Sequence, residues 1–244
     1  FDEPNLMFLD NYDILWICFD NGEFGVDIVF FDLKSLKYSE YKYIYQSKPY
    51  LNENSIGYRE KMKKKYPNKV KLKNGKILFK FPYNLPIHNP IKGIAQNKNG
   101  KILLVQSLMH MGLNGSLHFI EIENKYVKIF FLKDLIQYYE PFYEDAIFFN
   151  STEEYLGGCA FNVFNDSFYF YTNNGFWRIL KNENNYTKEF LFKPWINWTA
   201  GLPNALGYQM NVSKFEFISE NEMVFLTTSN GIGYFNGKEV VYFR

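Results

Sequence analysis

Short apolar runs separated by polar turns fill most of the chain. Three runs end in Asn-Gly at the same offset and then resume as a second apolar run, and they cover residues 15–22, 168–175 and 224–231. Asn-Gly between two apolar runs is a strong signal for a β-hairpin, because both residues tolerate positive φ in a type I′ turn. The pattern therefore predicts three hairpins. Their return strands are expected over 26–31, 176–180 and 232–235.

The middle of the chain contains the same combination of Asn-Gly and an apolar run in the opposite order. The hexapeptide Lys-Asn-Gly-Lys-Ile-Leu occurs at 73–78 and again at 98–103, so that Asn-Gly here precedes the strand. The second copy predicts a strand whose return partner covers 116–122. Strands and turns at this density are typical of an all-β chain.

The strands group into repeats of four. The clearest repeats cover 11–43, 92–131, 158–192 and 210–244, and a fifth is expected in 66–85. Four-strand repeats of about 40 to 55 residues predict a β-propeller, whereas shorter, evenly spaced strands would suit a sandwich. We expect an all-β fold: a single β-propeller domain over 1–244 with five blades, in a range of four to six, whose ring can be incomplete. Insert-like segments are expected near 46–69 and 132–157.

Composition narrows the classes of partner. Hydrophobic residues make up 47% of the 244 residues, which excludes a disordered chain. Lys and Arg total 27 against 26 Asp and Glu, so the charge balance gives no reason to expect nucleic acid as a partner. No apolar run approaches the ~20 residues of a membrane helix, so no transmembrane segment is expected.

Few residues suggest catalytic or metal chemistry. The sequence pairs no evident Ser or Cys with any of its three His, and it holds no phosphate-binding or zinc motif. Met109-His110-Met111 supplies too few ligands for a metal site, and His118 alternates with apolar neighbours as expected on the polar face of a strand. Cys18 and Cys159 are expected as buried free thiols rather than a disulfide. We expect neither a metal nor a cofactor.

Aromatic residues in loop-like surroundings are the best candidates for a binding site. Two Trp lie beside Pro, Asn and Gly, and three Tyr lie beside a Glu and a Pro. Aromatic faces stack on sugars or anchor a protein partner, but Trp and Tyr can equally pack between blades. The candidate ligand-binding residues are Trp195, Trp198, Tyr138, Tyr139, Glu140 and Tyr143.

One segment carries a family resemblance. Gly201-Leu202-Pro203-Asn204 is followed by apolar runs over 212–218 and 224–228 and then by Asn230-Gly231-Ile232, and 15–17 reads Leu-Trp-Ile. This order resembles the repeats of two-component regulator propellers. The resemblance implies an extracytoplasmic sensor region that binds a ligand, often a carbohydrate, on one face of a propeller.

Together these observations predict a non-enzymatic, extracytoplasmic propeller, either secreted, periplasmic or on the cell surface. It would recognise a glycan or a protein partner through the aromatic loop residues. Two alternatives stay open. One is a glycoside-processing enzyme that uses a carboxylate pair in a central pocket, for which Glu140, Glu144 and Asp145 are candidates. The other is a structural component of a larger surface assembly, which large apolar surfaces and an open ring would favour.

Overall fold

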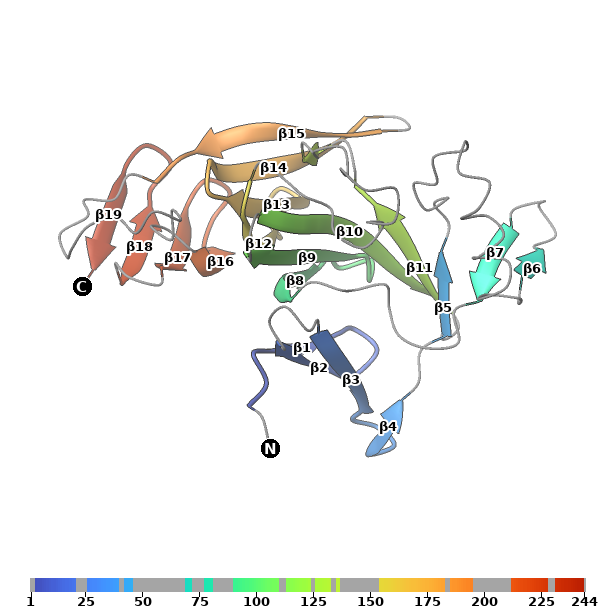
Figure 1. Cartoon of the computed structure of the whole chain (residues 1–244). Helices are drawn as coiled ribbons and strands as arrows, with labels where there is room; N and C mark the ends of the chain where they lie inside the picture. Colours follow the sequence, from blue (N-terminus) through green and yellow to red (C-terminus); the bar gives the residue numbers. More distant parts are fainter. Residues whose placement is uncertain are drawn as a thin grey trace.

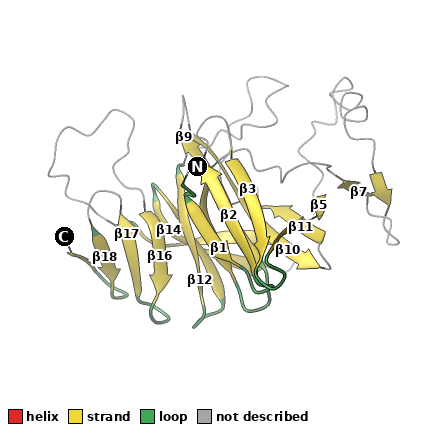
Figure 2. Cartoon of the chain, turned by 90° about the horizontal axis from the view of Figure 1, so that it is seen from below, coloured by secondary structure: helices red, strands yellow, loops and turns green. Residues whose placement is uncertain are grey.

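The computed structural model describes the chain in thirteen stretches, and every structural statement below concerns these. They are residues 3–20, 26–39, 42–45, 69–71, 77–80, 90–109, 113–123, 126–132, 135–136, 154–182, 185–194, 212–227 and 231–243. Within them the backbone forms β-strands joined by turns and loops (Figure 2). The predicted all-β class is confirmed.

Most strands belong to four antiparallel sheets in which the strands follow one another in chain order. The first sheet contains β1 (Leu6–Leu9), β2 (Ile14–Asp20), β3 (Val26–Asp32) and β4 (Lys37–Ser39). The second contains β8 (Ile91–Gln96), β9 (Ile102–Met109), β10 (Leu113–Glu123) and β11 (Tyr126–Phe131). The third contains β12 (Leu156–Asn162), β13 (Ser167–Thr172), β14 (Gly175–Asn182) and β15 (Asn185–Phe192). The fourth contains β16 (Val212–Phe217), β17 (Met223–Thr227), β18 (Ile232–Phe235) and β19 (Val240–Phe243).

Three further strands extend the second sheet. β5 (Lys42–Tyr45) pairs parallel with β11, β7 (Ile77–Lys80) pairs with β5, and β6 (Lys69–Lys71) pairs with β7. The fifth repeat expected in 66–85 therefore forms no sheet of its own in the described residues, and residues 42–43 leave the first repeat. β11 has six residues and pairs along its outer edge with all four residues of β5, whereas β4 has only three residues.

The predicted hairpins form, with one correction to a turn. Thr172 pairs with Gly175, so the two-residue loop between β13 and β14 is Asn173-Asn174 and not Asn-Gly. The positive φ of 132° falls on Gly175, the first residue of β14. The glycine therefore adopts a positive φ, which other residues rarely adopt, just after the turn and not within it.

The four sheets pack face to face in chain order, from the first sheet to the fourth (Figure 1). Between the first and second sheets, the buried Trp16 and Phe30 of the first sheet share a core with Leu104 and Ile120 of the second. Between the third and fourth sheets the buried ring of Phe176 lies 5.0 Å from that of Phe215. Apolar contact between neighbouring sheets is thus the main stabilising interaction of the stack.

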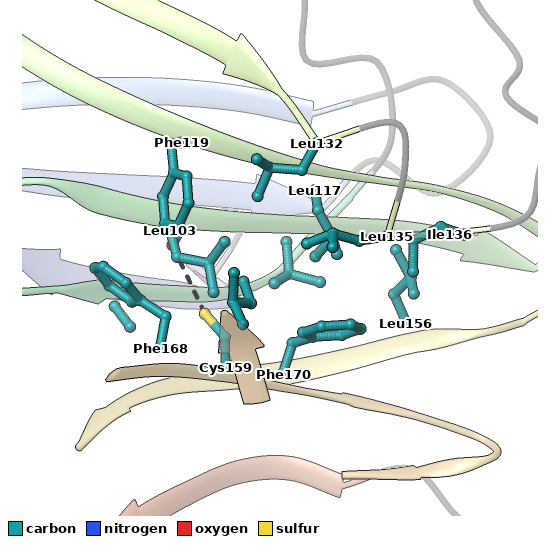
Figure 3. Packing of buried hydrophobic residues seen from close by; sticks show 13 residues of the cluster. Leu103, Leu117, Phe119, Leu132, Leu135, Ile136, Leu156, Cys159, Phe168 and Phe170 are labelled. Atoms are coloured by element: carbon teal, nitrogen blue, oxygen red, sulfur yellow. Dashed lines mark hydrogen bonds between the residues drawn. The ribbon is translucent and has the colours of Figure 1, made fainter. Parts of the chain in front are cut away.

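The core between the second and third sheets is the largest (Figure 3). Leu103 and Phe119 from the second sheet face Phe168 and Phe170 from the third. Cys159 lies among them as a free thiol, with its Sγ 3.7 Å from the carbonyl oxygen of Leu103. Cys18 is likewise free and buried, so the expected free thiols are confirmed.

The insert-like segment near 132–157 contributes to this same core. Leu132, Leu135 and Ile136 follow β11 directly, and all three are buried between the second and third sheets. Figure 3 shows their side chains beside Leu117 and Leu156. The start of the segment is therefore part of the packed structure.

Equivalent turns of neighbouring sheets are joined by hydrogen bonds. Asp10 and Asn97 directly follow the first strands of their sheets, and Asn162 is the last residue of β12. The side chains of all three accept hydrogen bonds from backbone N–H groups of the turn that comes next. Two further hydrogen bonds join neighbouring sheets. The backbone N–H of Asn11 in the first sheet donates to Gln96 Oε1 of the second (2.8 Å), and Asn162 Nδ2 of the third donates to the carbonyl oxygen of Glu220 in the fourth (3.0 Å). We call this end of the sheets the turn end.

The first strands of the sheets approach one another closely, with β12 lying between β8 and β16. Glycine makes this spacing possible. A Cβ at Gly93 of β8 would lie 2.5 Å from the backbone nitrogen of Cys159, and one at Gly158 of β12 would lie 2.9 Å from the carbonyl oxygen of Ser213. Both distances are below any van der Waals contact, so a side chain at either position would push the strands apart.

We predict that Gly93→Ala destabilises the protein. Alanine would ordinarily favour an extended strand by about 0.5–1 kcal/mol relative to glycine. Here the added carbon meets the backbone of β12, and overpacking of this kind costs about 1–3 kcal/mol. Chemical denaturation followed by circular dichroism should show a lower free energy of unfolding. Lys214→Ala on β16 is the control, because its side chain is 73% exposed, and it should change stability by less than about 0.5 kcal/mol.

Candidate functional site

The end of the sheets opposite the turn end carries the connections from one sheet to the next. At this end the backbone N–H of Leu156, the first residue of β12, donates to the Oγ of Ser107 near the end of β9 (3.2 Å). Lys92 of β8 forms an ion pair with Asp20 at the end of β2 (3.1 Å). These contacts align three neighbouring sheets, and we call this end the connection end.

The predicted site residues lie outside the described residues. Tyr138, Tyr139, Glu140 and Tyr143 belong to 137–153, and Trp195 and Trp198 belong to 195–211. The structure therefore leaves these six predictions untested.

The described flanks of both segments can nevertheless be placed. Residues 137–153 precede Leu156 of β12, and residues 195–211 follow Phe192 of β15 closely. The register of the third sheet joins these flanks, since Leu156 pairs with Thr172, Thr172 with Gly175, and Phe176 with Phe192. Both segments thus attach to the connection end of one sheet.

A buried polar cluster lies near the same end, on the face of the second sheet that packs against the first. It consists of Gln106 on β9 and of Ser116 and His118 on β10. His118 Nε2 lies 2.9 Å from Ser116 Oγ, and Ser116 pairs with Gln106 across the strands. All three side chains are at most 5% exposed.

This placement corrects two sequence-based expectations. His118 was expected on a polar strand face, but Ile120 and Ile122 on the same face belong to the core beneath the first sheet, so His118 is buried with them. No Ser was expected beside a His, yet Ser116 and His118 are neighbours. The period of two along a strand brings residues i and i+2 to one face, and a Ser-x-His search would have found the pair.

Burial determines the protonation of this cluster. Removal from water lowers the pKa of His118 from its ordinary 6.5 to about 4, so the ring is neutral at pH 7. A neutral imidazole 2.9 Å from a hydroxyl has the spacing of a nucleophile and its base. Ser116 is only 3% exposed, however, so a substrate cannot reach it while the first and second sheets remain packed together. The hydrogen bond of the pair satisfies His118 Nε2 and Ser116 Oγ inside the protein, whereas Gln106 Nε2 of the same cluster has no hydrogen-bond partner among the described residues.

Other ionisable groups in the described residues bridge neighbouring strands and sheets. Lys101 Nζ lies 3.0 Å from Glu121 and 5.0 Å from the ring centre of Phe119, beside Tyr186 of the third sheet. Among the residues that the structure describes, no three His, Cys, Asp or Glu side chains gather as a metal site. No helix in those residues has the length and hydrophobicity needed to cross a membrane.

Comparison with known proteins gives no family for the chain. No protein-family model matches the sequence, and no curated protein matches it.

We predict that His118 makes stability depend on pH. Between pH 6.5 and about 4 the unfolded chain binds a proton at this imidazole and the folded chain does not, so the free energy of unfolding falls as the pH falls through this window. The loss is on the order of 3 kcal/mol for a shift of this size. In urea titrations across this range, His118→Gln should lose stability less steeply than the natural protein. Parallel curves for the two proteins would contradict the assignment.

Proposed function

We propose that the four sheets are blades of a β-propeller and that this propeller is a non-enzymatic recognition module. Support comes from three features of the described residues. Three of the sheets are four-stranded antiparallel meanders, and the second sheet contains such a meander in β8 to β11. Neighbouring sheets pack face to face. The first strands of the sheets lie innermost and close together. The described residues supply four candidate blades, and the expected number is five in a range of four to six.

The proposed ligand site lies at the connection end, on the segments that join the blades. The observation that carries it is the attachment of both 137–153 and 195–211 to the same end of the third sheet. These two segments contain all six candidate residues, although they are far apart in sequence. A rigid sheet that anchors two aromatic-rich segments at one end favours a shared binding surface.

The chemistry of the six residues favours a glycan or a protein partner. Tyr and Trp rings would stack on sugar C–H groups or fill an apolar pocket of a partner, and Glu140 would accept hydrogen bonds from hydroxyl or amide groups. An extracytoplasmic location is part of the proposal and rests on the resemblance to two-component regulator propellers. The neutral charge balance also fits a ligand without strong charge.

We predict that the combined variant Trp195→Ala, Trp198→Ala and Tyr139→Ala loses ligand binding. Truncation of one anchoring aromatic residue at a hot spot costs about 2 kcal/mol or more, which is about 30-fold in affinity, so the triple variant should bind at least about 30-fold more weakly. The measurement is binding of the purified chain to a glycan array and, in parallel, to proteins of its source in a pull-down.

Phe164→Ala provides the matched control. Phe164 is an aromatic residue that is 56% exposed, but it lies in the turn after β12 at the turn end of the same sheet. This variant should bind as the natural protein does. Equal binding by the triple variant and the natural protein would overturn the proposal, as would a natural protein that captures neither a glycan nor a partner.

A further inference from the structure

The two end sheets each keep one face that no other sheet covers within the described residues. The first-sheet outer face is formed by Met7, Leu9, Leu15, Ile17, Val29 and Phe31. The fourth-sheet outer face is formed by Val224, Leu226, Ile232, Tyr234, Val241 and Phe243. Apart from Asp27 on the first sheet and Lys214 and Glu216 on the fourth, both faces are apolar, and both reach the solvent.

The exposure of these side chains is high for residues of their kind. Met7 and Leu9 are 63% and 50% exposed on the first sheet, and Leu226, Ile232 and Phe243 are 48%, 49% and 58% exposed on the fourth. Scattered exposed apolar residues are normal on a protein surface, but contiguous rows on adjacent strands mark an interaction site. Leu226 pairs with Ile232, and Ile232 pairs with Phe243, so these three form such a row.

One central strand in each end sheet has the sequence pattern of a strand buried on both faces. In the third sheet, β13 (Ser-Phe-Tyr-Phe-Tyr-Thr) buries all six residues between its two neighbours. A strand with one face in water should instead alternate apolar with polar residues. β2 (Ile-Leu-Trp-Ile-Cys-Phe-Asp) and β17 (Met-Val-Phe-Leu-Thr) do not alternate in this way, although the structure covers only one of their faces. Their pattern predicts a second covering layer.

The established interfaces indicate what such a layer is. Three times along the chain, one apolar sheet face packs on the next, and the inner strands come close together. The first-sheet outer face and the fourth-sheet outer face lie at the two ends of this stack, where a further sheet would pack if the stack continued. A sheet of the same kind fits both.

We propose that the first-sheet outer face of one copy of this chain packs on the fourth-sheet outer face of a second copy, head to tail. Each copy carries both outer faces, so a neighbouring copy can cover the uncovered face at either end. Such an interface is heterologous, and it closes into a symmetric dimer or continues as a longer assembly according to the rotation between copies. This inference rests on the packing of the sheets and does not depend on the proposed ligand.

Electrostatics does not oppose this contact. The charged residues on the described parts of the two outer faces are Asp27 on β3 and Lys214 and Glu216 on β16. Lys214 and Glu216 form an ion pair with each other at 2.8 Å, and the charges on the two faces are few and of both signs. The whole chain has a formal net charge of only +1, so two copies repel each other weakly.

Sedimentation velocity and light scattering on the complete 244-residue chain test the proposal. The natural protein should have a mass above the 29.1 kDa of one chain, and twice that value if the dimer closes. Two variants interrupt one face each: Met7→Lys with Leu9→Lys, and Leu226→Lys with Ile232→Lys. Burying a lysine against an apolar surface is costly, so each variant alone should associate at least about tenfold more weakly than the natural protein.

Mixing the two variants distinguishes a head-to-tail contact from a symmetric one. In the mixture, the intact fourth-sheet outer face of one variant meets the intact first-sheet outer face of the other, so an association of one copy of each should return. Val163→Lys is the control, since Val163 is 69% exposed in the turn after β12 and belongs to neither face. This control should associate as the natural protein does.

Three results would overturn the proposal. They are a monomeric natural protein, a loss of association with only one of the two face variants, and a mixture that stays monomeric. Because all four substituted positions are exposed, each variant should retain its far-ultraviolet circular dichroism spectrum. A variant that unfolds would be replaced by Leu9→Ser or Ile232→Ser at the same face, with the same expected outcome.

Discussion

The close approach of the innermost strands is the constraint on which the stack of sheets depends. At Gly93, Gly157 and Gly158 a single added carbon would collide with backbone atoms of the next strand. These glycines allow β8, β12 and β16 to lie side by side, and the wider parts of the sheets then meet through their side chains. Without this spacing the neighbouring faces would separate, and the apolar surfaces between them would be exposed to water.

Large aromatic residues fill the wider space between the sheets. The ring of Phe176 lies about 5 Å from the rings of Tyr171, Phe192 and Phe215. The third sheet buries aromatic residues on both faces, with Phe168 and Phe170 towards the second sheet and Tyr169 and Tyr171 towards the fourth. The described tryptophans have structural roles: Trp16 is fully buried, with its Nε1 donating to Asp10 Oδ2, and Trp177 Nε1 donates to Thr172 Oγ1. This use of Trp is the packing alternative that the sequence also allowed for Trp195 and Trp198.

The two ends of the sheets differ in construction. At the turn end, Asp and Asn side chains close short turns and link each sheet to the next. At the connection end, the chain passes between sheets through longer segments that are rich in Tyr, Trp and Pro. Short, internally bonded turns leave few side chains free to meet a ligand, whereas long connections on a rigid base can present several. The proposed binding surface is placed at the connection end for this reason.

The sequence alone determined the local structure. Short apolar runs and Asn-rich turns predicted the strands and the three hairpins correctly, because these depend on neighbouring residues. The candidate site followed only from residue type, and its six residues remain a prediction. Tertiary structure decided what depends on distant contacts: the pairing of β5 with β11, the burial of His118 beside Ser116, and the two uncovered apolar faces. A local pattern shows that a strand face is apolar, but only the packing of whole sheets shows which faces are covered.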